Sequence, residues 1–320
     1  MDLSYINFVP RQRGLLGVEK VTLAYTLFTA AVIGLVWADM NAPLQLILGR
    51  AFIVIGMALT VATYHVVPTR ATLLLRYIYP LSLLAYWYPD TYEFCQLFPN
   101  LDHLFAAADL ALFGCQPSLV FHNVMPSKIW SELFHLGYFS YYPMIAFTVL
   151  VPLFVDRPRF GRTAFVVLTS FFLYYLIYLF LPVAGPQYYF RAIGVDAAMQ
   201  GQLAHVGDYF RTHTEMLPSP GANGFFRELV ESAQESGERP TAAFPSSHVG
   251  ISTVLMTILW KDNHRKLWLV MLPFYVLLCC ATVYIEAHYF VDVIGGLLTA
   301  FLFYWASNRL YPHMERIRFR

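Results

Sequence analysis

Apolar runs long enough to cross a lipid bilayer constrain this chain more than any other feature of its sequence. A transmembrane helix needs about 20 mainly apolar residues. The eight expected spans are 21–37, 44–67, 71–88, 130–154, 163–183, 246–260, 267–284 and 289–307. With 58% hydrophobic and 13% charged residues, the 320-residue chain is too apolar for an ordinary soluble domain. We therefore predict an all-α integral membrane protein, a polytopic helical bundle of about eight transmembrane helices.

The order of the spans predicts how the chain is organised. The first two spans can form a helical hairpin, so residues 1–70 are predicted as an N-terminal transmembrane hairpin and residues 71–320 as a second membrane domain. Residues 101–113 have the pattern of a short amphipathic helix that ends at Gly114 and lies along the membrane surface. The polar stretch 184–241 is too long for a simple connection, and we expect it to cover the active site in part.

Basic residues indicate how the chain is oriented. Fifteen of the 21 Lys and Arg residues, including those of the tail 316–320, fall on one side of the eight expected spans. By the positive-inside rule both termini are cytoplasmic, and the site faces the periplasm or lumen of a bacterial inner membrane or a Golgi-type membrane. Arg50 and Arg76 lie near helix ends, where we expect their side chains to snorkel to the interface. The net charge of +1 gives no reason to expect nucleic acid as a partner.

Two histidines are predicted to meet on the outer side of this topology. His248 begins the sixth span and His288 lies between the seventh and the eighth. Asp292 follows His288 by four residues, so the two side chains should share one helix face. The carboxylate can then hydrogen-bond one ring nitrogen and leave the other free as a nucleophile, while His248 protonates the departing alcohol oxygen.

Polar groups for holding a phosphate are expected at the same depth. Ser246 and Ser247 stand at the start of the sixth span, where backbone N–H groups and the helix dipole favour an anion. Gln187 and Tyr188 follow a Gly-Pro turn at the outer end of the fifth span and arrive at that depth as well. We expect all four residues to contact the substrate.

Each of these patterns also has an ordinary structural explanation. A His-x-x-x-Asp pair arises often by chance in a chain with ten His and twenty acidic residues. Two histidines and one aspartate could supply three zinc ligands, but no His-Glu-x-x-His motif or cysteine cluster accompanies them, so we predict no metal and no cofactor. Asp102 and Asp109 are expected to form the polar face of the surface helix, and Glu286 to be a solvated loop charge.

Two segments resemble a known enzyme family. Phe-Pro-Ser-Ser-His at 244–248 and Thr-Val-Tyr-Ile-Glu-Ala-His-Tyr-Phe-Val-Asp at 282–292 are similar to the second and third signature motifs of the type 2 phosphatidic acid phosphatase superfamily. The resemblance is best from about the fifth span onward. It implies a six-helix phosphatase-type core after the hairpin, with His288 as the nucleophile, Asp292 as its partner and His248 as the general acid, without metal.

The chain departs from the family phosphatases where they carry phosphate-binding cations. Ala281 and Thr282 stand at the places of their Ser-Arg pair, and Ser232 stands at the place of the lysine in their first motif. Compensation of the phosphate charge must therefore come from elsewhere. Arg191 and Arg239 in the outer stretch are the cations that we expect to supply it, and a surface position is the alternative for each.

The pattern around the second histidine is closer to one branch of the superfamily. Thr-x-Tyr-x-x-x-His-Tyr-Phe-Val-Asp, with the Gly-Pro turn, resembles the inositol phosphorylceramide synthases, and sphingomyelin synthases are a more distant comparison. Tyr284, which lies in this pattern, is included among the expected substrate-binding residues. Members of the branch move a phosphorylated head group from a glycerophospholipid to a ceramide alcohol and release diacylglycerol.

The predicted function is therefore that of a membrane lipid phosphotransferase that acts through a phosphohistidine. Its expected partners are a phospholipid donor, such as phosphatidylinositol, and a ceramide-like or other lipid acceptor. The alternative is a lipid phosphate phosphatase that hydrolyses a phosphatidic-acid-like or polyprenyl phosphate with the same three residues. A non-enzymatic lipid transporter would instead place ionisable residues at mid-membrane on several helices.

Overall fold

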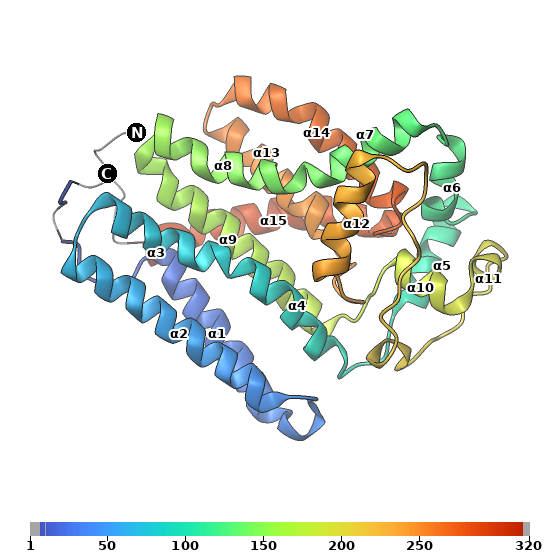
Figure 1. Ribbon diagram of the computed structural model, residues 1–320, viewed down its shortest axis with the longest axis horizontal. Coiled ribbons are helices and arrows are strands. Elements are labelled where there is room, and N and C mark those ends of the chain that lie inside the picture. The colour runs from blue at the N-terminus through green and yellow to red at the C-terminus, as the bar shows by residue number, and fades with distance from the viewer. Residues whose placement is uncertain (1–6, 10, 316–320) are drawn as a thin grey trace. The chain divides into compact units, whose positions relative to one another are not determined.

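The computed structural model describes residues 7–9 and 11–315, and within these residues all regular secondary structure is helical (Figure 1). The only β-type pairing described is an isolated bridge between Phe8 and Thr69. This confirms the predicted all-helical class. The basic tail at 316–320, which contributed to the predicted orientation, lies outside the described residues.

Six helical segments of the described chain are long and apolar enough to cross a membrane. They are α1 (Gly17–Leu35), α2 (Pro43–Val66), α7 with α8 (Lys128–Phe139 and Tyr141–Val155), α9 (Arg157–Phe180), α14 (Arg265–Tyr284) and α15 (Phe290–Met314). The bent pair α5 (Asp102–Phe113) and α6 (Pro117–Val124) would make a seventh if it were one span. These helices support the prediction of a polytopic membrane protein.

Two of the eight expected spans correspond to shorter helices. The run at 71–88 is divided between α3 (Arg70–Ser82) and α4 (Leu84–Cys95), each of which contains a proline. The run at 246–260 is α13 (Ser247–Lys261), whose 15 residues rise by about 22 Å at about 1.5 Å per residue. A hydrocarbon layer is about 30 Å thick, so α13 alone is shorter than a full span.

The chain divides into two compact units. Unit 1 comprises the described residues of 1–87, 149–172 and 304–320, and unit 2 comprises 88–148 and 173–303. Long helices such as α9 and α15 contribute to both. The functional division of the chain at residue 70 stays a prediction.

In unit 1, helices α1, α2 and α3 pack against one another around buried polar pairs. Arg76 is fully buried and donates from Nε and Nη2 to the Glu19 carboxylate, both at 2.7 Å. Arg50 is 2% exposed, and its Nε donates to Thr29 Oγ1 at 2.9 Å. The expectation that Arg50 and Arg76 snorkel is therefore wrong, because each guanidinium has a polar partner inside the protein.

In unit 2, helix α5 has the predicted extent and ends at Gly114, which adopts a left-handed conformation with φ 70°. Its two acidic residues do not form a solvated face, because Asp102 and Asp109 are both 0% exposed. Asp109 accepts hydrogen bonds from the backbone N–H groups of Phe290 and Val291 at 2.8 and 3.0 Å. A carboxylate of α5 thus caps the start of α15, which an amphipathic pattern could not reveal.

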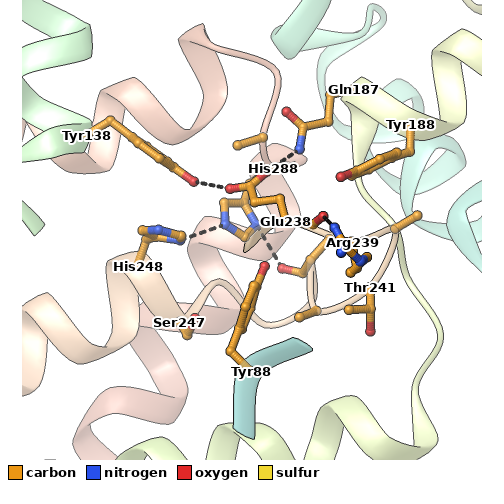
Figure 2. Close-up of a pocket in the computed structure, with 14 residues that line it drawn as sticks. Tyr88, Tyr138, Gln187, Tyr188, Glu238, Arg239, Thr241, Ser247, His248 and His288 are labelled. Carbon is orange, nitrogen blue, oxygen red and sulfur yellow. Dashed lines mark hydrogen bonds between the residues drawn. The ribbon is translucent and has the colours of Figure 1, made fainter. Parts of the chain in front are cut away.

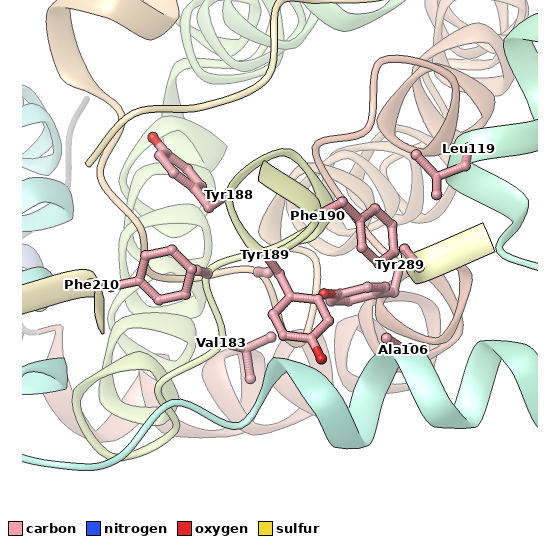
Figure 3. Close-up of a cluster of buried hydrophobic side chains, with 11 residues drawn as sticks. Ala106, Leu119, Val183, Tyr188, Tyr189, Phe190, Phe210 and Tyr289 are labelled. Atoms are coloured by element: carbon pink, nitrogen blue, oxygen red, sulfur yellow. The ribbon is translucent and has the colours of Figure 1, made fainter. Parts of the chain in front are cut away.

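The polar stretch 184–241 is largely ordered into short helices of unit 2. These are α10 (Pro186–Ile193), α11 (Val195–Met199), the 3₁₀ helix η3 (Tyr209–Arg211) and α12 (Phe225–Gly237). Helix α10 packs against α5, and α12 packs against α7. Buried aromatic side chains of α10 pack with Phe210 and Tyr289, as Figure 3 shows, so the stretch shares a hydrophobic core with other parts of unit 2.

Candidate functional site

Unit 2 contains a pocket of about 320 Å³ that includes both predicted histidines, His248 and His288 (Figure 2). Its lining comes from α4, α7, α10, the N-terminus of α13 and the connection after α14. Both ends of the stretch 184–241 reach it, so residues distant in sequence meet here.

The ring of His288 is held in one tautomer by a backbone carbonyl. Nδ1 lies 2.8 Å from the carbonyl oxygen of Ala243, and an oxygen of this kind only accepts hydrogen bonds. Nδ1 of the neutral ring therefore carries the proton, and Nε2 keeps its lone pair. Burial lowers the pKa of His288 to about 4, so the ring is neutral at pH 7. These are the properties that a nitrogen nucleophile requires.

Asp292 does not bind the ring of His288 in the way that the four-residue spacing predicted. Its Oδ2 lies 3.5 Å from Nδ1 of His288, farther than the Ala243 carbonyl, and accepts a 2.8 Å hydrogen bond from the backbone N–H of Tyr289. The expected carboxylate–imidazole hydrogen bond is thus replaced by a bond to the carbonyl. The reason is local, since α15 begins at Phe290 and His288 precedes the helix on which the four-residue spacing was based.

His248 faces the free nitrogen of His288. Nδ1 of His248 lies 3.5 Å from Nε2 of His288, and the ring centroids are 5.7 Å apart. Tyr138 stacks on the His248 ring at 4.6 Å, and Tyr141 contacts it at 4.5 Å. The aromatic contacts restrict the His248 ring to an orientation in which it can exchange a proton with a group bound beside Nε2.

The backbone brings the two motifs together through close contacts. The N–H of Ser246 donates to the carbonyl of Asp292 at 3.0 Å, while the Ser246 hydroxyl accepts from the N–H of Val249 at the start of α13. A Cβ at Gly296 would lie 2.5 Å from the Ser246 carbonyl oxygen. Glycine at this position therefore permits α13 and α15 to approach closely enough for the histidines to meet.

The Gly-Pro turn is fixed next to His288 by a second carboxylate of α5. Asp102 accepts from the N–H groups of Ala184 and Gly185 at 2.7 and 2.8 Å, and from the hydroxyl of Tyr289 at 2.9 Å. Gly185 has φ +99°, and a Cβ there would lie 2.8 Å from the carbonyl oxygen of Ala287. Asp102 therefore positions the turn and the residue that follows His288 without entering the pocket.

Four of the seven predicted substrate-binding residues line the pocket, namely Gln187, Tyr188, Arg239 and Ser247. The other three lie outside it. Ser246 is the N-cap of α13. Arg191 is exposed on the last turn of α10. The Tyr284 hydroxyl donates to the carbonyl of Met125 at 3.1 Å within a hydrophobic cluster. The structure brings Arg239 to the site but leaves Arg191 at the surface.

Glu238 is a pocket residue that the sequence argument missed. Its carboxylate accepts from Gln187 Nε2 at 2.7 Å, from the Tyr138 hydroxyl at 3.1 Å and from Gln234 Nε2 at 3.3 Å (Figure 2). Burial raises the pKa of Glu238. In the sequence, only its position directly before Arg239 could have indicated Glu238 as a site residue. No spacing of residues along the chain connects it to Gln187 or Tyr138.

Glu286 is not the solvated loop charge that we expected. The residue is 5% exposed, and its Oε1 lies 3.6 Å from Nδ1 of His122. Burial raises the pKa of Glu286 to about 7. Its backbone carbonyl accepts from the N–H of Gln187 at 2.9 Å, which ties the connection after α14 to the start of α10.

Residues 103–306 match the PAP2 superfamily, and the chain is therefore a member of this superfamily. Membership supports a lipid enzyme of the phosphatase or phosphotransferase type and confirms the resemblance at the level of the superfamily. Comparisons with curated proteins and with solved structures gave no significant match. Among the described residues, no group of three or more His, Cys, Asp and Glu is placed to hold a metal ion.

Proposed function

We propose that this protein is a lipid phosphotransferase of the inositol phosphorylceramide synthase type. It moves a phosphorylated head group, such as phosphoinositol, from a glycerophospholipid to a ceramide-like alcohol, with release of diacylglycerol. The observation that carries the proposal is the orientation of His288, whose Nδ1 is bonded to the Ala243 carbonyl at 2.8 Å while Nε2 faces His248 at 3.5 Å.

In the first half-reaction, Nε2 of His288 attacks the phosphorus of the donor. The bond between phosphorus and the diacylglycerol oxygen breaks, and His248, whose protonated form is favoured by the negative charge of the bound phosphate, gives its proton to that oxygen. The phosphorus, still bonded to the head group, is now attached to His288. The Ala243 carbonyl and the nearby Asp292 carboxylate, at 2.8 and 3.5 Å from Nδ1, stabilise the positive charge that develops on the ring.

In the second half-reaction, the hydroxyl oxygen of the acceptor lipid attacks the same phosphorus. The bond between phosphorus and Nε2 breaks, and His248, which is now neutral, accepts the hydroxyl proton. Both half-reactions use the same two nitrogens, as microscopic reversibility requires. The distribution of Lys and Arg supports placing this chemistry on the periplasmic or lumenal side.

The groups around the histidines support transfer from a phosphodiester. Ala281 and Thr282, which replace the Ser-Arg pair of the phosphatases, are both 0% exposed, and the Thr282 hydroxyl donates to a carbonyl of its own helix at 2.9 Å. The side-chain amide of Gln187 is bonded to Glu238 and Gln234. These residues provide no cationic clamp of the kind that suits a phosphate dianion.

The competing function is hydrolysis of a lipid phosphate with water as the second nucleophile, because the same phosphohistidine can be resolved by either hydroxyl. The test is to incubate the purified protein in detergent micelles with phosphatidylinositol of defined acyl chains, with and without ceramide, and to identify the products by mass spectrometry. We expect diacylglycerol together with a new phosphosphingolipid when ceramide is present.

A parallel incubation with phosphatidic acid discriminates the two functions. Release of free phosphate from phosphatidic acid, with no new sphingolipid from phosphatidylinositol and ceramide, would contradict the proposal and identify a phosphatase. The control is the His248→Ala variant, in which both activities should be lost if they depend on the same acid.

A further inference from the structure

A carboxylate is an unexpected group in a pocket that receives phosphate. Glu238 follows α12 and lines the same pocket as His248 and His288 (Figure 2). A negative charge repels a phosphate, and the repulsion grows with the charge of the phosphate. The presence of Glu238 therefore restricts which phosphate esters can bind.

The carboxylate is held in place by its neighbours. Oε2 accepts from Gln187 at 2.7 Å and from Gln234 at 3.3 Å, while Oε1 accepts from Tyr138 at 3.1 Å. Tyr138 also stacks on the His248 ring, so one side chain orients both groups. An ionised carboxylate has about four acceptor sites. Three are occupied, and the remaining one on Oε1 can accept from a hydroxyl or ammonium group of a substrate.

Compensating positive charge is sparse around Glu238. The one Lys or Arg side chain that lines the pocket in the described residues is that of Arg239, and its Nη1 donates at 2.7 Å to the backbone carbonyl of Glu238 and not to the carboxylate. Ser232, at the place of the lysine in the first phosphatase motif, is exposed on α12. The negative charge of Glu238 is thus balanced by neutral amide and hydroxyl donors.

We propose that Glu238 is a specificity-determining residue that selects phosphodiester donors over phosphomonoesters. A phosphomonoester carries a charge of about −1.5 to −2 at neutral pH, because its second pKa is about 6, whereas a phosphodiester carries a single negative charge. Glu238 repels the monoester more strongly, and it accepts a hydrogen bond from a hydroxyl-bearing or amine-bearing head group, which a monoester lacks. This inference rests on the proposed function, because it concerns donor choice at the same site.

The test compares kcat/KM for phosphatidylinositol and for phosphatidic acid with identical acyl chains, with ceramide present for the first substrate. Wild type should prefer the diester. In Glu238→Gln we expect the ratio of diester to monoester kcat/KM to fall by about tenfold or more, with an absolute gain on phosphatidic acid, because a like charge has been removed. A purely structural role would lower both values in parallel, and that result would overturn the inference.

A second variant and a matched control complete the test. Glu238→Ala removes the charge without introducing an amide beside Gln187, and we expect the same fall in the ratio of diester to monoester kcat/KM. This variant serves as the test if Glu238→Gln folds poorly. Glu235→Gln removes a charge from an exposed position of the same helix and should leave the ratio unchanged. If wild type prefers the diester and both Glu238 variants keep that preference, only the Glu238 inference fails. If wild type prefers phosphatidic acid, both the Glu238 inference and the proposed function fail.

Discussion

The two compact units bury charge in different ways. In unit 1, Glu19 and Arg76 are both 0% exposed and neutralise each other through an ion pair at 2.7 Å. In unit 2, Asp102, Asp109 and Asp292 are equally buried, but the groups that donate to them are backbone amides, one side-chain amide and one tyrosine hydroxyl.

This difference in partners indicates different roles for the buried charges of unit 1 and those of unit 2. A buried carboxylate without a cation is costly unless hydrogen bonds compensate it. In unit 2 these hydrogen bonds fix residues 184–185 and 289–291, which lie next to His288 in space or in sequence. We therefore infer that the ion pair of unit 1 contributes to stability, whereas the carboxylates of unit 2 position the site.

The largest expected effect is the loss of turnover in His288→Ala. Removal of a covalent nucleophile lowers kcat by at least about 10³-fold, while the variant should remain folded because the ring is not part of the carboxylate framework. Product formation and thermal unfolding in detergent measure the two properties. His213→Ala, at an exposed position, is the control. Substantial turnover in His288→Ala would end the assignment of this residue.

Glu19→Ala should have the opposite profile. It leaves the buried Arg76 without its partner, and breaking a buried ion pair costs about 3–5 kcal/mol of unfolding free energy. The kcat of the molecules that remain folded should change by less than about twofold, since effects on stability and chemistry separate when the sites are independent. Replacing both partners by methionine should restore most of the stability. A large drop in kcat of the folded protein would break the proposed contrast between the units.

Asp102→Asn should affect both properties to a smaller extent. Asp102 accepts four hydrogen bonds, those from Ala184, Gly185 and Tyr289 and one from the side-chain amide of Asn100. The Asn side chain keeps the size but cannot accept all of them, so we expect a loss of about 1–3 kcal/mol. Because the Gly-Pro turn and Tyr289 lose their anchor, kcat should fall by about tenfold. Asp196→Asn, at an exposed position of α11, is the control. Unchanged kcat with lowered stability would show that Asp102 serves the fold alone.

The smallest expected effect is on the pH dependence of stability. The pKa of His288 is lowered from 6.5 to about 4 in the folded protein, so the unfolded ring binds a proton first as the pH falls. The resulting stability is fully present above about pH 6.5 and is lost as the pH falls towards about 4. Unfolding in detergent at about pH 7 and about pH 5 should show a smaller decrease for His288→Gln than for wild type. Equal decreases would contradict the lowered pKa.

Local patterns predicted much of the fold. The limits of α5 and its end at Gly114 follow from periodicity and from a residue that tolerates positive φ. The apolar runs predicted the long helices, but composition does not report breaks such as that between α3 and α4. Two histidines that are forty residues apart could be assigned to one end of the bundle because successive spans alternate in direction.

The sequence could not predict which polar groups become partners. Asp102 bonds to a residue 187 positions away, and Gln187 bonds to Glu238, 51 positions away, through contacts that depend on how the segments pack. The hydrogen bond from His288 to the Ala243 carbonyl involves a backbone atom, which carries no side-chain signal. We expected the carboxylates of Asp102, Asp109 and Glu286 to face solvent, but all three are buried. A carboxylate can be buried at low cost only where hydrogen-bond donors surround it, and the sequence does not show which donors those are.

The central claim is that Nε2 of His288 forms a covalent bond to the phosphorus of the donor lipid. The most direct test is to mix the purified protein with phosphatidylinositol without ceramide, quench the reaction rapidly at alkaline pH and analyse the peptides by mass spectrometry. We predict an adduct of the phosphorylated head group on His288 that disappears when ceramide is added and is absent from His288→Ala. An adduct on His248, or turnover by wild type without any adduct on His288, would contradict the account.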